Sequence, residues 1–449
     1  MSAKPKEHGL SSPLSDGLEN PPSVWPSVLL SDCAVVQTGV AKGRKLAERE
    51  SITVPYLRVA NVQDGYLDLN EIKTIEIKKS ELPRFQLQHG DVLLTEGGDF
   101  DKLGRGFVWH GQIDPCVHQN HVFAVRVDRN QLTPEFFAYQ AQSSYGKAYF
   151  LSVAHKTTNL ACINTTKLKA FPVLIPPLPE QQKIAAVLGV VQRAMEQQER
   201  LLALTAELKK TLLHQLFTQG LRHEPQKPTD IGPVPESWEV LPLSDCAVVQ
   251  TGAAKGRNFK GNETIEAPYL RVANVQSGYL NLTEMKTITI QAKELLRYAL
   301  HDGDIVLTEG GDFDKLGRGF IWRGQIKDCV HQNHVFAVRV DRKRLLPEFF
   351  AHQSQSQYGK AYFLSVAHKT TNLACINTTK LKAFPVLIPS MEEQQEIVAA
   401  LEGIDAKLST VRRKHATLTA LFRTLLHQLM TAQIRVDQLV PLGAATGSE

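Results

Sequence analysis

Cys116, His118 and His121 come nearest, among the residues of this sequence, to a metal-binding pattern. In an extended strand Cys116 and His118 would share one face, because side chains alternate along a strand. A structural zinc site usually takes four ligands, and the sequence offers no fourth one nearby. We therefore expect ordinary packing and hydrogen bonding at these positions, and no metal site.

Two short patterns could indicate an enzyme, and each is incomplete. Asn20-Pro21-Pro22-Ser23 approaches the Asn-Pro-Pro-aromatic motif of adenine methyltransferases, but Ser23 is not aromatic and no strand precedes it. Glu71-Ile72-Lys73 could mimic the Glu-x-Lys of a nuclease, but the preceding Asp68 becomes Asn281 in a second copy of the segment. The sequence has no GxxxxGK(S/T) loop, and no glycine-rich cofactor loop follows a strand. We therefore expect no catalytic centre.

An internal repeat dominates the sequence, because residue n matches residue n + 213 along most of the chain. The run from Tyr145 to Pro176 recurs without a change from Tyr358 to Pro389. Between Ser31 and Glu180, roughly three-quarters of the positions are identical to their partners. This period is far longer than the repeat of a solenoid, which runs to about 20–50 residues. The sequence therefore predicts a duplicated domain with a duplicated connector, related by an approximate two-fold axis.

The first part of each repeat has the pattern of a mixed α/β globule. Its apolar runs are short and are broken by Gly, Asp and Pro, as expected for strands. Examples are Asp91–Leu94, Val122–Val127 and Phe171–Ile175. A short helix is expected near Pro134 to Ser143, since proline suits a first helical position.

The second part of each repeat has the pattern of one long helix. From Pro179 to Gln219 there is no internal proline, and apolar residues recur at helical spacing. We expect a helix of roughly 38 residues, about 57 Å long at 1.5 Å per residue. The stretch from Glu392 to Thr431 keeps this periodicity. A small domain cannot bury the whole apolar face of so long a helix, so we expect the two helices to pack on each other as an antiparallel coiled coil.

These patterns predict an α+β protein with two globular domains separated by two long helices. The expected parts are a disordered tail at 1–20, a domain at 21–178, a helix at 179–222, a linker at 223–235, a second domain at 236–389, a second helix at 390–432 and a disordered tail at 433–449.

Composition is that of an ordinary globular protein, with 43% hydrophobic and 22% charged residues among 449. The net charge of +5 permits nucleic-acid binding without establishing it. The six cysteines fall at three pairs of equivalent repeat positions, which favours reduced thiols over disulfides. No apolar run approaches the roughly 18 residues of a membrane span, and the N-terminus has no apolar core of a secretion signal, so we expect a cytoplasmic location.

Five segments together resemble the specificity subunits of type I restriction–modification enzymes. They are Ile175–Ile184 (IPPLPEQQKI), Gly232–Glu239 (GPVPESWE), Pro55–Gln63 (PYLRVANVQ), Cys116–Phe123 (CVHQNHVF) and Thr157–Ala161 (TTNLA). The resemblance covers about residues 21 to 432 and comes twice, as two cycles of a domain followed by a long helix.

The resemblance implies a non-catalytic subunit with two target-recognition domains. Each domain would read half of a split site in double-stranded DNA, and the paired helices would set the gap and dock two methyltransferase subunits. Restriction–translocase subunits would join this core. S-adenosylmethionine, ATP and Mg²⁺ would serve those partners, and no cofactor is expected in this chain. The alternatives are the recognition subunit of a bipartite type II enzyme, a single-chain enzyme that modifies DNA, and a coiled-coil adaptor.

Because the domains are near copies, we expect them to read the same half-site on opposite strands, giving an interrupted palindrome. The main differences that could break this equality are Lys45–Arg49 against Asn258–Asn262, Lys78-Lys79 against Gln291-Ala292, His110 against Arg323, and Tyr139 against His352.

Candidate DNA contacts are the polar residues that both repeats share, because Arg, Lys, Asn and Gln read base edges and Lys, Arg and small polar groups hold phosphates. In the first repeat they are Lys42, Arg44, Arg58, Asn61, Gln63, Lys102, Arg105, Lys156, Thr157 and Asn159. In the second they are Lys255, Arg257, Arg271, Asn274, Gln276, Lys315, Arg318, Lys369, Thr370 and Asn372.

Each of these clusters also has a purely structural interpretation. Arg58, Asn61 and Gln63 alternate, as on one side of a strand, but some of them could tie down local loops. The loop with Lys102 and Arg105 is glycine-rich and suits a close backbone approach, or is a plain hairpin. Asn159 could cap local structure. The basic turn at Lys42 could be a solvated loop, and Gln119 or Asn120 could also face DNA.

Overall fold

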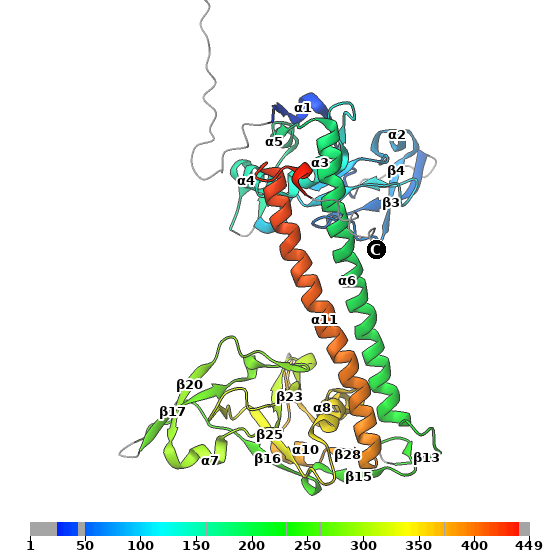
Figure 1. Cartoon of the computed structure of the whole chain (residues 1–449). Coiled ribbons are helices and arrows are strands. Elements are labelled where there is room, and N and C mark those ends of the chain that lie inside the picture. The colour runs from blue at the N-terminus through cyan, green and yellow to red at the C-terminus, as the bar shows by residue number, and fades with distance from the viewer. Residues whose placement is uncertain are drawn as a thin grey trace, which may run out of the picture. The chain divides into compact units, whose positions relative to one another are not determined.

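The computed structural model describes residues 25–43, 50–158, 160–229, 231–259, 263–371 and 373–439. The chain forms two compact units: unit 1 holds residues 1–198 and 414–449, and unit 2 holds residues 199–413 (Figure 1). None of the helices in these described ranges is both long and apolar enough to span a bilayer.

The centre of unit 1 is an antiparallel sheet of four strands in the order β2–β9–β5–β7. Its strands are β2 (Ala34–Thr38), β9 (Val122–Val127), β5 (Val92–Thr95) and β7 (Gly106–Val108). Every residue of β5 is buried: Val92, Leu93 and Leu94 are apolar, and the hydroxyl of the buried Thr95 donates to the Lys102 carbonyl oxygen. This sheet supports the rest of the unit.

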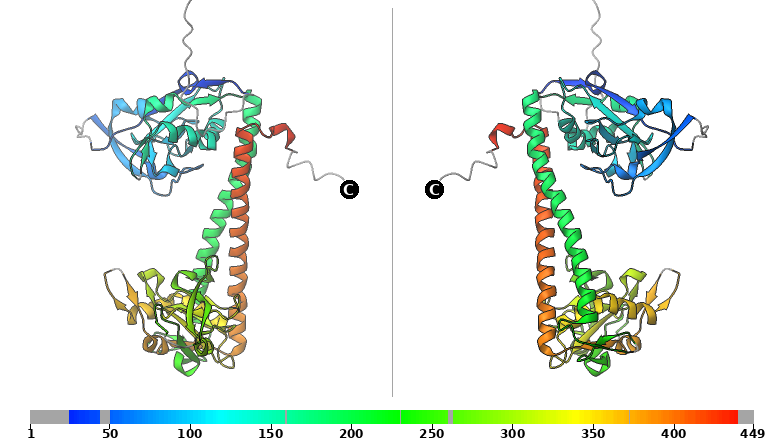
Figure 2. Two further views of the ribbon diagram at one scale, coloured as in Figure 1. Left: turned by 90° about the vertical axis from the view of Figure 1, so that its left-hand side faces the viewer. Right: turned by 90° about the vertical axis from the view of Figure 1, so that its right-hand side faces the viewer.

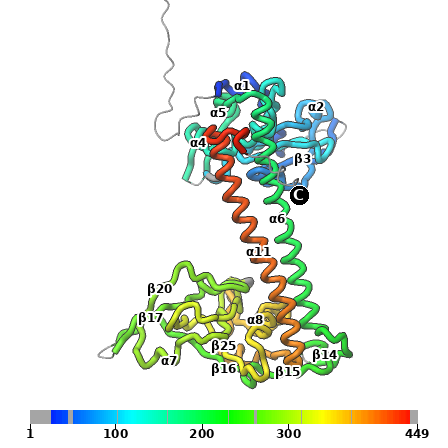
Figure 3. Tube along the Cα trace, in the orientation of Figure 1, coloured from blue at the N-terminus to red at the C-terminus, as the bar shows by residue number. Residues whose placement is uncertain are grey.

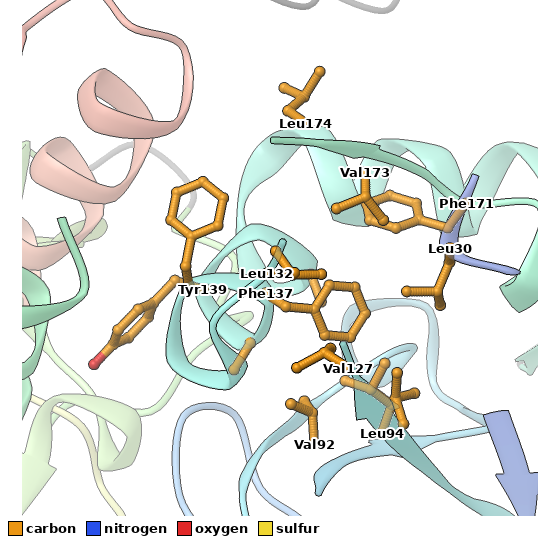
Figure 4. Packing of buried hydrophobic residues seen from close by; sticks show 14 of the residues in the cluster. Leu30, Val92, Leu94, Val127, Leu132, Phe137, Tyr139, Phe171, Val173 and Leu174 are labelled. Atoms are coloured by element: carbon orange, nitrogen blue, oxygen red, sulfur yellow. The ribbon is translucent and has the colours of Figure 1, made fainter. Parts of the chain in front are cut away.

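One face of the central sheet carries the main core of unit 1. Helices α3 (Pro134–Gln142) and α4 (Ser144–Val153) pack there with α1 (Leu30–Cys33), α5 (Thr165–Lys169) and the strand pair β1 (Ser27–Leu29) and β12 (Pro172–Leu174). Phe137 and Phe171 meet edge to face in this core, with Val92 and Leu94 from the sheet in the same cluster (Figure 4). The expected helix near Pro134 is confirmed.

Two smaller sheets flank the central sheet of unit 1. The first has the order β4–β3–β8, with strands β4 (Lys73–Lys78), β3 (Ser51–Leu57) and β8 (Val117–His118), and α2 (Leu82–Phe85) lies beside it. The second has the order β10–β11–β6, with strands β10 (His155–Lys156), β11 (Ala161–Cys162) and β6 (Gly97–Gly98). Both sheets consist of short strands whose connecting loops carry most of the candidate residues.

Unit 2 repeats this architecture with the same register. Its central sheet has β16 (Ala247–Thr251), β25 (Val335–Val340), β21 (Ile305–Thr308) and β23 (Gly319–Ile321). The flanking sheets have β20 (Lys286–Gln291), β17 (Thr264–Leu270) and β24 (Val330–His331), and β22 (Gly310–Gly311), β27 (Ala374–Cys375) and β26 (His368–Lys369). Strands β18 (Val275–Gln276) and β19 (Tyr279–Leu280) form a further small pair, and β15 (Glu239–Pro242) pairs with β28 (Pro385–Ile388). Its short helices are α7 (Leu295–Tyr298), α8 (Pro347–Gln355), α9 (Gln357–Val366) and α10 (Thr378–Lys382).

Two long helices follow the globular domains, and each continues from one unit into the other. They are α6 (Leu178–Gln219, 42 residues) and α11 (Met391–Met430, 40 residues), slightly longer than expected. In unit 1 the start of α6 lies beside the end of α11 (Figure 3). Ile184 and Leu188 of α6 belong to the same core as Leu429 of α11. Unit 2 pairs the end of α6 with the start of α11, so the helices are antiparallel as predicted (Figure 2).

The structure corrects two expected boundaries. The segment 223–235 is not a plain linker, because β13 (Gln226–Lys227) pairs with β14 (Val234–Pro235) and Val234 is buried in the core of unit 2. The expected tail after Gln433 is ordered as far as Leu439, because Val436 and Leu439 pack on the core of unit 1. Residues 1–20 lie outside the described ranges. In both corrected segments, isolated apolar residues find a core that the sequence alone does not show.

A buried glutamine fixes the start of each long helix. The Gln181 side chain donates to the carbonyl oxygens of Gln131 and Pro176, both at 2.8 Å, and accepts from the backbone nitrogen of Thr133 at 2.8 Å. Gln394 makes the equivalent three hydrogen bonds in unit 2. The motif at the start of the helix is therefore an anchor between helix and domain.

Replacing Gln181 by alanine should lower the free energy of unfolding by about 2 kcal/mol, because three buried backbone groups lose their partner. Urea denaturation of the purified protein measures this loss. Gln182 is exposed at the next position, so Gln182→Ala is the matched control and should change stability by less than about 0.5 kcal/mol. Equal stability of the two variants would contradict the anchor.

Candidate nucleic-acid interface

A single loop, Gln119–His121, brings the predicted clusters of unit 1 together. The Gln119 backbone nitrogen donates to the Leu57 carbonyl oxygen at 2.9 Å, and the Asn120 nitrogen donates to that of Val40 at 3.0 Å. The His121 carbonyl oxygen accepts from the Glu96 nitrogen at 3.0 Å. The loop therefore joins the chain segments that lead to Lys42, Arg58 and Lys102. The same three bonds recur in unit 2 around residues 332–334.

The basic turn near Lys42 lies against the β4–β3–β8 sheet. The Lys42 Nζ atom is 5.6 Å from the centre of the Tyr56 ring, a cation–π distance. Arg44 lies outside the described residues. In unit 2 the exposed Lys255 borders a cavity of about 440 Å³ whose other lining residues include Arg257, Glu266, Tyr269, Arg271, Lys286 and Gln332. Of the four cations that line it, Arg257 pairs with Glu294, and Arg271 and Lys286 lie within 3.7 Å of Glu284, so Lys255 is the lining cation best placed to meet a phosphate.

Arg257 is already held by a carboxylate of the same unit. Its guanidinium donates to both oxygens of Glu294, at 2.7 and 2.8 Å, and lies 4.9 Å from the centre of the Phe259 ring. This bidentate bond lowers the pKa of Glu294, so the pair stays charged at neutral pH. Arg257 therefore shapes the cavity wall, while Lys255 is exposed beside it.

Arg58 and Asn61 support a loop. The chain leaves β3 at Leu57 and forms a turn over Val59–Asn61, so the expected strand alternation of these residues is wrong. The buried Asn61 amide donates to the carbonyl oxygens of Asp68 and Glu71 and accepts from the Arg58 backbone nitrogen, and Arg58 also donates to Glu71. Asn274 and Arg271 repeat these bonds in unit 2. These hydrogen bonds favour the structural interpretation, in which Asn61 and Asn274 hold their loops in place.

Arg105 joins the glycine-rich loop to the loop that contains Gln63. The Arg105 Nη1 atom donates to Gln63 Oε1 at 3.0 Å, and Arg318 donates to Gln276 at the same distance in unit 2. Lys102 pairs with Asp99 and lowers its pKa; Lys315 pairs with Asp312 in the same way. Two clusters that are about 40 residues apart in the sequence are thus one surface in the structure.

The hairpin that carries Lys156 and Thr157 lies beside the same glycine-rich loop. Ala161 and Cys162 of β11 pair with Gly98 and Gly97 of β6, so closely that a Cβ atom on Gly97 would lie 2.9 Å from the Ala161 carbonyl oxygen. The close backbone approach expected for this loop is therefore made by the hairpin. Lys156 and Thr157 are exposed, as are Lys369 and Thr370 in unit 2, while Asn159 and Asn372 lie outside the described residues.

The Cys116, His118 and His121 pattern separates in space. Burial raises the pKa of the Cys116 thiol to about 12, and His118 is buried with its Nδ1 atom 2.7 Å from the Val122 carbonyl oxygen. Burial also lowers the pKa of His118, so this imidazole is neutral. His121 is exposed and pairs with Glu96. Within the described ranges, no group of three His, Cys, Asp or Glu residues is placed to hold a metal ion.

The structure adds residues that sequence reasoning missed. Lys73 and Lys286 lie on the strands opposite Tyr56 and Tyr269, and Lys286 and Tyr269 both line the cavity of unit 2. The strand pairing that brings them together spans 17 residues and leaves no local signal in the sequence. Gln332 also lines the cavity, and its Oε1 atom accepts from the Val272 backbone nitrogen at 3.2 Å.

Comparison with known proteins gives one consistent result. The family described as type I restriction modification DNA specificity domain matches residues 22–206 and 235–420. The chain is 24% identical over 430 residues to the type I restriction enzyme MjaVIII specificity subunit of Methanocaldococcus jannaschii, covering 93% of this chain and 95% of that protein. It is 21% identical over 407 residues to the type I restriction enzyme EcoKI specificity subunit of Escherichia coli, covering 85% and 82%.

Solved structures share the fold. The S subunit of a type I restriction–modification system from M. genitalium superposes with a TM-score of 0.53 at 15% identity, covering 92% of this chain and 97% of that one. A chain from a structure on the assembly and conformational transition of a type I R-M system superposes with a TM-score of 0.52 at 17% identity, covering 92% and 99%. At these identities the likeness concerns the fold alone.

Proposed function

The chain belongs to the family of type I restriction–modification DNA specificity domains, and from this premise we propose that each of its two units reads one half of a split DNA target. The observation that carries the proposal is the duplication of the same basic and amide side chains around the same loop in both units. Two like readers joined by long helices fit a two-part site, as in dimeric DNA-binding proteins.

The side chains divide by chemistry into two roles. Lys42, Lys156 and their copies Lys255 and Lys369 are exposed and hold phosphates, which fixes the position of the domain on the duplex. Gln119 and its copy Gln332 are amides that can bond a base edge. Arg58, Asn61 and their copies hold the neighbouring loop of residues 58–71 and its copy 271–284.

The near identity of the units favours a target whose halves are equal. Differences at the β4–β3–β8 sheet are partly compensated: Thr53 lies opposite Glu76 in unit 1, and Glu266 lies opposite Thr289 in unit 2. Each unit therefore has one threonine and one glutamate at this cross-strand pair, and the two residue types are exchanged between the strands. Two such readers on opposite strands read an interrupted palindrome.

The two long helices set the gap between the half-sites and dock two methyltransferase subunits, which the restriction–translocase subunits join. Catalysis belongs to those partners, together with S-adenosylmethionine, ATP and Mg²⁺, and the complex acts on cytoplasmic DNA. Two features support this division of labour: the named relatives are specificity subunits, and α6 and α11 are each about 60 Å long at 1.5 Å per residue.

Replacing Lys42 and Lys255 by alanine should weaken DNA binding by about tenfold and lower the slope of log K against log salt by about 2, because two phosphate contacts are lost. Fluorescence anisotropy with the methyltransferase-bound protein and its target duplex measures both quantities. The loss should be similar on specific and non-specific DNA.

The matched control for this experiment is Lys343→Ala. Lys343 is exposed, and it follows the end of β25 that is farther from the loop around Gln332. Its removal should leave the affinity within about twofold if the interface lies at that loop. An equal loss for Lys343→Ala, or an unchanged salt slope for the double variant, would contradict the assigned face.

Inserting four residues after Leu208, as a second copy of Thr205–Leu208, should widen the gap of the target by one to two base pairs. The reason is that four helical residues add about 6 Å, against about 3.4 Å for one base pair. Methylation mapping of cells that carry the variant reads the gap directly. An unchanged gap would contradict the role of the helices as a spacer.

A further inference from the structure

Each globular domain packs on the start of the helix that follows it and on the end of the other long helix. Four positions at this contact, which we call the joint, differ between the repeats. In unit 1 the joint consists of Tyr139, Gly189, Gln192 and Phe422, and in unit 2 of His352, Glu402, Asp405 and Lys209. The leucines nearby are the same in both helix ends, Leu213 and Leu216 against Leu426 and Leu429.

The joint of unit 1 centres on an aromatic pair, and the charged side chains of Arg193 and Glu196 lie next to it. Tyr139 is buried, and its ring meets that of Phe422 edge to face, with the centres 6.1 Å apart. The hydroxyl points away from Leu132 and Phe137 (Figure 4) and lies 3.6 Å from where a Cβ atom on Gly189 would stand. The Gln192 amide donates to the Gly65 carbonyl oxygen. The missing side chain at Gly189 leaves room for the tyrosine.

The joint of unit 2 is built from ionisable groups. The Lys209 Nζ atom lies 2.5 Å from Asp405 Oδ1, and the two side chains are only 21% and 35% exposed. His352 lies beside them, and burial together with Lys209 lowers its pKa to about 4, so it is neutral at pH 7. Glu402 lines the same cavity of about 270 Å³. Here a half-buried ion pair replaces the aromatic pair.

The two sets of side chains are poorly interchangeable. Lys209 placed on the domain of unit 1 would find glutamine at the position of Asp405. The carboxylate nearby, that of Glu196, already accepts from Gln192, and Arg193 adds a like charge. Phe422 placed on the domain of unit 2 would leave Asp405 half-buried and unpaired. A half-buried charge without its partner is costly, because it loses water and gains nothing in return.

We propose that the four joint positions specify which helix end each domain accepts. The leucines cannot provide this choice, since they are the same in both helix ends, and the remaining apolar difference is Phe217 against Met430. Paired differences on the two sides of a contact do provide it, because each wrong combination is penalised. In a chain whose repeats are so alike, this specificity disfavours any pairing in which a domain accepts the helix end that belongs to the other domain.

Three full-length variants of identical amino-acid composition test the proposal. The first exchanges the helix ends, Lys209→Phe with Phe422→Lys. The second exchanges the receiving sides: Tyr139→His, Gly189→Glu and Gln192→Asp, with His352→Tyr, Glu402→Gly and Asp405→Gln. The third combines both exchanges and so restores each matched set in the other unit.

The first and second variants should each lower Tm by about 4 °C or more, and the third should return to within about 2 °C of the native protein. Calorimetry measures these values. Exchange of another differing helix-end pair, Phe217→Met with Met430→Phe, is the control and should cost about 2 °C or less, since both residues are apolar. A third variant that melts no higher than the first two, or that fails to fold, overturns the proposal, as does a first variant with native Tm.

Discussion

Neither globular domain can complete its core with its own repeat alone. In unit 1, Leu426, Leu429 and Met430 come from the end of α11, and in unit 2, Leu216 and Phe217 come from the end of α6. Each long helix therefore begins on one domain and ends on the other. Only an antiparallel pair of helices satisfies both cores, so this shared burial dictates the direction of the helices and the packing of Val436 and Leu439 beyond the end of α11.

The features that could be predicted from the sequence are those with a periodic or repeated signal. The duplication and the long helices follow from the 213-residue match and from apolar spacing. The hairpin of β13 and β14 and the packing of Val436 could not be predicted, because a single apolar residue in a polar segment does not reveal the core that receives it. These segments depend on tertiary contacts rather than on local pattern.

For the candidate site, the sequence indicated which residue types to consider but not how they are arranged. The exposed lysines were identified, whereas Asn61 belongs to loop support because its amide is fully used by the backbone. The pairing of β3 with β8, which are 60 residues apart, places the Gln119–His121 loop at the centre of the surface. Lys286 and Tyr269 become visible as cavity residues only through strand register.

The central claim is that this chain chooses a gapped DNA site with two equal halves. The most direct test is a genome-wide methylation map of a host that carries this gene and its partner methyltransferase, compared with the same host lacking the gene. We predict that one gapped palindromic motif is methylated in the host that carries the gene and is unmethylated in the host that lacks it. Loss of a gapped but asymmetric motif would contradict the equality of the halves, and an unchanged map would contradict the role of the chain in sequence choice.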